Sequence, residues 1–134
     1  MFRKRLKQKV RDWCNKTYTK KLTVTFNKDH APSHNHRCHI NADHMVKAGH
    51  AVAVAEVVMI DADSCTLHYI NMDANGDYFD CTLGYQWSGD DYRLIRLLNQ
   101  FPAYPGDHLN DEKRRICKDA LGRLGKIHDA LDLL

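Results

Sequence analysis

The sequence lacks a long apolar run and any close pair of cysteines. No stretch of its 134 residues approaches the roughly 20 apolar residues that a membrane-spanning helix needs. The first residues, MFRKRLKQKVRDW, are charged throughout and lack the apolar centre of a secretory signal. The five cysteines, an odd number, stand far apart with no CxxC pair. We therefore expect a cytoplasmic protein with reduced thiols and no membrane contact.

Internal repeats, low-complexity tracts and long linkers are also absent, so we expect one domain over residues 1–134. Hydrophobic residues make up 43% of the chain, which argues against disorder. A chain of this length can bury a core without disulfides or a structural metal. Within the domain, the sequence predicts a basic N-terminal arm (1–21), a core with catalytic features (22–100) and a C-terminal helix (110–132).

Charge is distributed unevenly along the chain. The net charge is +3, but residues 1–21 contain nine Lys or Arg and one Asp, while the remaining residues are acidic overall. A basic arm on an acidic body suggests contact with nucleic acid or with an acidic protein. No recognised nucleic-acid-binding motif accompanies it, and the alternative is a solvated helix that aids solubility. The candidate phosphate contacts are Arg3, Lys4, Arg5, Lys7, Lys9 and Arg11.

Hydrophobic periodicity predicts an α+β fold. Apolar residues at helical spacing favour helices over 3–16, 38–48, 90–98 and 110–132. Alternating or continuous β-branched runs favour strands over 21–26, 51–60, 64–72 and 77–83. We therefore expect a small antiparallel sheet that packs against the helix at residue 38 and against the C-terminal helices.

Cys38 stands where a polar, His-rich loop gives way to a helical pattern. A helix N-terminus lowers the pKa of a thiol, which makes this cysteine a candidate nucleophile. Its own N–H could stabilise an oxyanion, and the side chains of Ser33 and Asn35 are candidates for the second donor. The alternative is a buried packing thiol, but the polar neighbours of Cys38 argue against a core position. The other four cysteines are interpreted as packing residues.

His68 lies in the middle of a predicted strand, which suits a general base that must keep a fixed orientation. Whether Asp80 on the next strand can orient it depends on one turn. A three-residue turn, Ala74-Asn75-Gly76, places His68 and Asp80 on one face as diagonal neighbours. A two-residue Asn-Gly turn places them on opposite faces. In the alternative interpretation, Asp80 holds the turn that follows its own strand.

The segment with "CHxN", "HxxN" and "DxTxG" resembles papain-like and transglutaminase-like thiol hydrolases over residues 33–84. In that superfamily a cysteine opens a helix, and a histidine and an aspartate or asparagine follow on successive strands. The resemblance implies a papain-like core with Cys38 as nucleophile, His68 as base and Asp80 as orienting carboxylate. The motifs also resemble small bacteriophage proteins, which implies the cytoplasm of a host. His39 and Pro32 depart from the family pattern, and both departures concern the oxyanion hole.

A metal site is the competing interpretation of the His-rich loop. Its histidines, His30, His34 and His36, are types of ligand that zinc accepts. Their spacing matches no standard chelate, and a solvated loop is the simpler interpretation. No cofactor is therefore expected.

Two functions remain open from the sequence. The first is a thiol hydrolase or acyl transferase that cleaves an amide, ester or isopeptide bond in a peptide-like or acyl substrate. The second is a non-enzymatic binding protein, viral in origin, whose basic arm contacts nucleic acid or an acidic protein.

Overall fold

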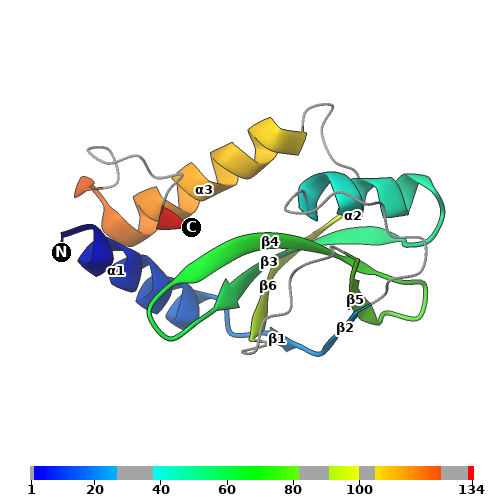
Figure 1. The fold of residues 1–134 in the computed structure, drawn as a ribbon, viewed down its shortest axis with the longest axis horizontal. Coiled ribbons are helices and arrows are strands. Elements are labelled where there is room, and N and C mark those ends of the chain that lie inside the picture. Colours follow the sequence, from blue (N-terminus) through cyan, green and yellow to red (C-terminus); the bar gives the residue numbers. More distant parts are fainter. Residues whose placement is uncertain (1, 27–37, 82–90, 100–104, 125–132) are drawn as a thin grey trace.

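The chain folds into helices that cover one side of a curled sheet. The computed structural model describes residues 2–26, 38–81, 91–99, 105–124 and 133–134. These residues form three helices and six strands, and the expected α+β class is confirmed (Figure 1). In chain order the elements are α1 (Phe2–Thr17), β1 (Lys21–Leu22), β2 (Val24–Phe26), α2 (Cys38–Lys47), β3 (Ala53–Ile60), β4 (Cys65–Met72), β5 (Tyr78–Asp80), β6 (Tyr92–Leu98) and α3 (Pro105–Leu121).

The strand order, β1-β6-β3-β4-β5-β2, places β1 and β2 at opposite edges of the sheet. Thr23 alone separates these strands along the chain, so Leu22 and Val24 lie within about 7 Å of each other. The two edges come this close because the sheet rolls up, and Figure 1 shows the β1–β2 segment passing beneath it. The sheet therefore approaches a barrel with an inner and an outer face.

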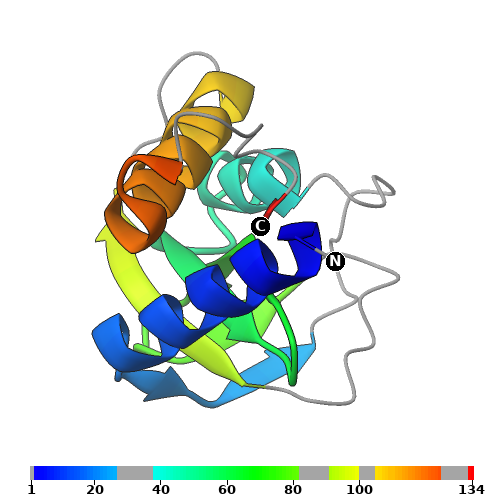
Figure 2. The same cartoon turned by 90° about the vertical axis from the view of Figure 1, so that its left-hand side faces the viewer.

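Both faces of the central strands β3 and β4 are largely buried. Every residue of β3 is buried, as the continuous apolar run over 51–60 predicts. The outer face packs against all three helices, and Figure 2 shows α1 and α3 side by side. The inner face is filled by apolar side chains from four strands: Leu22, Ala55, Val57, Met59, Ile70 and Tyr92. Polar groups that point inward are therefore shielded from water.

The helix expected over 90–98 is wrong, because residues 92–98 form strand β6. This strand pairs antiparallel with both β1 and β3. A bulge between Glu56 and Val57 of β3 leaves Ile95 as an extra residue in β6. The extra residue interrupts the alternation of inward and outward side chains along β6. Tyr92, Ile95 and Leu98 therefore follow each other at a spacing of three, which resembles the pattern of a helix. Pairing with two neighbouring strands decides the conformation.

The strand expected over 21–26 is divided in two at Thr23. Its first part, β1, pairs antiparallel with β6, and its second part, β2, pairs in parallel with β5. The sheet is therefore mixed, and the expectation of a purely antiparallel sheet is wrong. Rolling of the sheet allows one short run of sequence to supply both of its edges.

The C-terminal helix α3 begins earlier than the expected range 110–132, and residues 125–132 of that range lie outside the described part of the chain. It starts at Pro105, which suits a first helical position because the missing N–H has no acceptor there. Leu121 is its last residue, and Gly122 follows with a φ of +59°. Pro105 and Gly106 are thus the first two residues of α3.

The hairpin between β4 and β5 has the three-residue turn on which the site depends. Asn71 lies opposite Phe79, and the Asp73 N–H donates to the Asp77 carbonyl at 2.9 Å. Gly76 adopts a φ of +84°, the left-handed conformation that this turn requires. Of the two turns that the sequence left open, the structure has the one that places His68 and Asp80 on one face.

Replacement of Gly76 by alanine tests the role of this turn. A Cβ at Gly76 meets no neighbouring atom, so the penalty comes from the positive φ and lowers the free energy of unfolding by about 1–2 kcal/mol. Gly106→Ala is the matched control, because Gly106 lies in α3, also in open space, and alanine there leaves stability equal or slightly higher. Urea unfolding of both variants provides the comparison. Equal losses in the two variants would contradict the assigned turn.

Candidate active site

Cys38 is the first residue of α2 and faces the sheet. The helix start is confirmed, but the thiol is only 7% exposed and belongs to the core between α2 and the outer face. The expectation that its polar neighbours keep Cys38 out of the core is therefore wrong. Ala42, one turn further along α2, is fully buried against the same face, so the helix is seated closely on the strands.

The backbone of β4 offers a hydrogen-bond donor to this thiol. The Asp73 N–H donates to the Asp77 carbonyl, on the β5 side of the hairpin. Because N–H groups alternate in direction along a strand, those of Asn71 and Tyr69 point toward the same side. Asn71 is the last of these residues that pairs with β5 within the described ladder. The N–H of Tyr69, two residues earlier, is thus directed past the end of β5. It donates to the sulfur of Cys38.

His68 and Asp80 form a buried pair on the inner face of the sheet. The His68 Nε2 atom lies 2.7 Å from Asp80 Oδ2, and both side chains are 0% exposed. The phenol of Tyr92 on β6 donates to the same Oδ2 atom at 3.2 Å. A side-chain hydrogen bond also joins His68 to the thiol of Cys38. Asp80 therefore binds His68, and the turn after its strand, residues 82–84, lies outside the described part of the chain.

Hydrogen bonds around Cys38 lower the pKa of its thiol to about 6. Burial alone would raise this pKa, but side-chain hydrogen bonds from His39 and His68, the charge on His68 and the Tyr69 N–H together stabilise the thiolate. Burial would likewise lower the pKa of His68, yet hydrogen bonds and the negative charges of Asp80 and Cys38 raise it to about 10. Between about pH 6 and pH 10, the pair is therefore thiolate and imidazolium.

An amide side chain fixes α2 to the sheet. Asn71 lies on the outer face, opposite in direction to His68, as strand alternation predicts. Its Nδ2 donates to the Ala42 carbonyl at 2.9 Å and to the Ala53 carbonyl at 3.3 Å. Since Ala42 is in α2 and Ala53 in β3, this one side chain links the helix that carries Cys38 to the strands. Asn71 thus positions the nucleophile, and it does not orient His68.

Several candidate residues lie outside the described part of the chain. These are the oxyanion candidates Ser33 and Asn35 and the metal-ligand candidates His30, His34 and His36. Among the residues that are described, no group of three or more His, Cys, Asp or Glu side chains could hold a metal ion. Within the same part of the chain, no helix has the length and apolar character to cross a membrane.

The sequence did not indicate Tyr69 or Tyr92 as members of the site. Tyr92 was assigned to a helix, although Tyr92 and Leu94 alternate on the inner face as strand residues do. Tyr69 contributes through its backbone N–H, which no side-chain pattern reveals. The direction of the Tyr69 N–H follows from the register of the β4–β5 hairpin, which can be worked out once the turn at Gly76 is known.

Searches of protein-family models, curated proteins and solved structures find no match to this chain. The interpretation of the site therefore depends on its own geometry.

Alkylation at different pH values tests the ionisation of Cys38. An ordinary cysteine is only about 0.3% thiolate at pH 6, whereas about half of Cys38 is. Burial and the charge of Asp80 raise the pKa of Cys81 to about 12. Burial also raises the pKa of Cys117, to about 11. Iodoacetamide should modify Cys38 first, with a rate that rises through about pH 6, when sites are mapped by mass spectrometry. A rate that rises only near pH 8.5, or no preference for Cys38, would contradict the assignment.

Proposed function

We propose that this chain is a thiol-dependent hydrolase or acyl transferase that acts on an amide, ester or isopeptide bond. The observation that carries the proposal is the buried His68–Asp80 pair beside a thiol of low pKa at a helix start. A nucleophile, a base within reach and a third group that orients the base are the signature of covalent catalysis. The resemblance to papain-like and transglutaminase-like enzymes supports the same assignment, with the papain-like core as part of the proposal.

The reaction begins from the thiolate–imidazolium pair. The Cys38 sulfur attacks the substrate carbonyl carbon, and the C=O electron pair moves to oxygen to give a tetrahedral intermediate. The intermediate collapses to a thioester as His68 gives its proton to the leaving amine or alcohol. His68, now neutral, takes a proton from water or from an acceptor nucleophile that attacks the thioester. The second tetrahedral intermediate then releases the acyl product and the thiolate, so the starting pair is restored.

Asp80 and Tyr92 keep His68 ready for both proton transfers. The 2.7 Å contact between Asp80 and Nε2 fixes the orientation of the ring. Tyr92, at 3.2 Å, satisfies the same carboxylate oxygen and limits its rotation. Both contacts lie inside the rolled sheet, where the exclusion of water strengthens electrostatic interactions. The role of Tyr92 is positioning, because it acts through Asp80.

The start of α2 provides a donor for the oxyanion. The first N–H groups of a helix have no acceptor within the helix, and the N–H of Cys38 belongs to this set. This N–H is on the nucleophile's own residue, close to where the carbonyl oxygen of the substrate becomes negative. The positive end of the helix dipole acts in the same direction.

Hydrolysis of an activated ester, p-nitrophenyl acetate, tests the assignment. Wild type should form an acetyl thioester on Cys38 that mass spectrometry detects, with a rate limited by ionisations near pH 6 and pH 10. Cys38→Ser should form no thioester, and Asp80→Asn should lower the rate by about 10²–10⁴-fold. His44→Gln, on the exposed side of α2, is the control and should match wild type. Full activity in Cys38→Ser would overturn the proposal.

A second candidate function, nucleic-acid binding, is favoured by the placement of charge on α1. The apolar face of α1 is buried through Leu6, Val10 and Cys14. Most of its basic side chains therefore lie on the side of the helix that faces away from the core. Its first turn contains basic residues and no acidic ones, although the helix dipole makes that end unfavourable for cations. This arrangement costs helix stability, and a bound polyanion would offset the loss. Because the apolar face is already buried, it cannot insert into a membrane.

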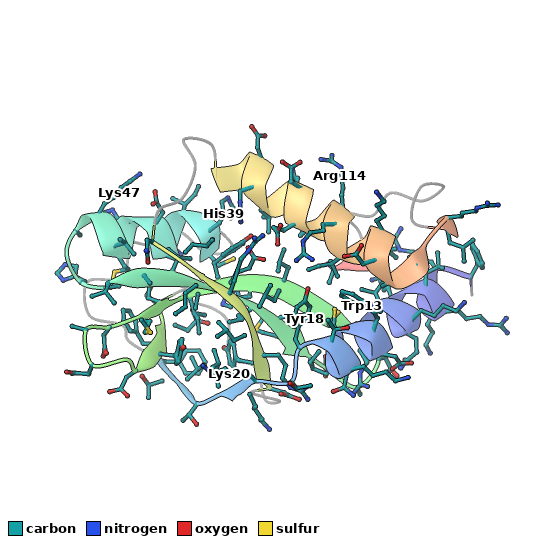
Figure 3. The ribbon with its side chains drawn as sticks, turned by 180° about the vertical axis from the view of Figure 1, so that it is seen from behind. Trp13, Tyr18, Lys20, His39, Lys47 and Arg114 are labelled. Atoms are coloured by element: carbon teal, nitrogen blue, oxygen red, sulfur yellow. The ribbon has the colours of Figure 1, made fainter. Side chains whose placement is uncertain are left out.

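Salt-dependent binding of a labelled single-stranded oligonucleotide tests this second function. The triple variant Arg3→Gln, Lys4→Gln, Lys9→Gln removes exposed charges and should reduce the slope of log K against log salt by about 2. Lys47→Gln is the control, because Lys47 lies on α2 at the other end of the molecule from α1 (Figure 3). Its slope should equal that of wild type. No binding at low salt, or binding only to anionic lipid vesicles, would contradict the assignment.

A further inference from the structure

A cavity of about 330 Å³ opens between α3, β6 and the end of α1, on the helix-covered side of the sheet. It is lined by Tyr18, Ile95, Arg96 and Arg115. Figure 3 shows Tyr18 between α1 and α3. The bulge in β6 shapes one wall, because the extra residue Ile95 places Arg96 opposite Glu56. Two guanidinium groups and a phenol thus meet at one opening that the surrounding elements hold in place.

One buried carboxylate orients both guanidinium groups. Glu112 accepts two hydrogen bonds from Arg115, at 3.0 and 3.2 Å, and its Oε1 atom lies 2.5 Å from Arg96 Nη2. Arg115 also donates to the phenol oxygen of Tyr18 at 3.3 Å. Both arginine side chains remain nearly half exposed, at 45% and 40%. They therefore present fixed N–H donors to whatever enters the cavity.

The second carboxyl group of the cluster, Glu56, is uncharged at neutral pH. It is fully buried, and it faces Tyr69 from β4, Arg96 from β6, and His108 and Glu112 from α3. Burial, followed by its hydrogen bond with Glu112 and the charge on that residue, raises the pKa of Glu56 to about 8.

Glu112 carries the negative charge of the pair. Burial alone would raise its pKa, but hydrogen bonds from Glu56, Arg115 and Arg96 lower it to about 2. Burial lowers the pKa of His108, so this ring is neutral at pH 7. Two guanidinium charges thus stand against the Glu112 carboxylate, and the half-exposed Asp119 carboxylate lies 3.6 Å from Arg115 Nη1.

We propose that this cavity binds a small oxyanion, the carboxylate or phosphate group of a ligand, between Arg96 and Arg115. Guanidinium N–H donors match both groups in geometry. The ordered side chains mean that little rotamer freedom is lost on binding. This inference goes beyond the proposed thiol chemistry, since anion binding here is expected whether or not Cys38 is a nucleophile.

Titration with sodium phosphate and, separately, with sodium acetate tests the site, followed by ¹H–¹⁵N NMR at constant ionic strength. Shifts should be largest at Tyr18, Ile95 and the two arginines. Arg115→Gln should weaken binding about tenfold or more, because it removes one of the two guanidinium groups. Arg114→Gln removes the same charge from the neighbouring residue, which points away from the packed side of α3 (Figure 3) and should bind as wild type. The anion that binds more tightly, phosphate or acetate, would show whether the ligand group is a phosphate or a carboxylate.

The pH dependence provides a readout that a simple loss of folding cannot imitate. As pH rises through about 8, Glu56 ionises and adds a negative charge to the cavity wall, so affinity should fall. Glu56→Gln keeps the shape and the neutral state, and it should bind equally well on both sides of that pH. Two results would overturn the proposal: no shifts with either anion, or equal affinities in Arg114→Gln and Arg115→Gln.

Discussion

The hydrogen bond between His68 and Asp80 is the interaction on which the site depends. Both side chains are fully buried, so each requires the other, and loss of one partner from such a pair costs about 3–5 kcal/mol. The bond exists because the β4–β5 hairpin has a three-residue turn, and a shift of one residue would move Asp80 to the outer face. Secondary structure, stability and the proposed chemistry therefore all depend on one register.

The rolled sheet gives this pair its surroundings. A flat sheet would leave the inner face open, whereas the approach of β1 to β2 encloses His68, Asp80 and Tyr92 among apolar side chains. In that setting, a charged imidazole is stable only because a carboxylate and a thiolate lie next to it. Cys38 reaches the pair from the outer side at the point where β5 ends. Tyr69 connects this region to the arginine cluster, since its N–H binds the thiol and its phenol binds Glu56.

The sequence predicted the features that local chemistry decides. The helix start at Cys38 and the strand around His68 follow from periodicity. The sequence left two turns open around Gly76, and the structure has the three-residue one. It could not predict the features that tertiary pairing decides. The bulge at Ile95 disguised β6 as a helix, and the closure of the sheet divided 21–26 into two edge strands. The sequence did not predict the cluster of Glu56, Arg96 and Glu112, because its members are far apart in the sequence and share no motif.

The charge state of His68 decides whether the thiolate–imidazolium pair exists. ¹⁵N NMR of the imidazole distinguishes the doubly protonated ring from either neutral tautomer, and it can be followed against pH in wild type and in Cys38→Ser. We expect both ring nitrogens of His68 to carry protons between about pH 6 and pH 10, and the imidazolium to titrate at lower pH once the thiolate is removed. A wild-type ring that loses its proton near the ordinary value of about 6.5, unchanged in Cys38→Ser, would contradict this expectation.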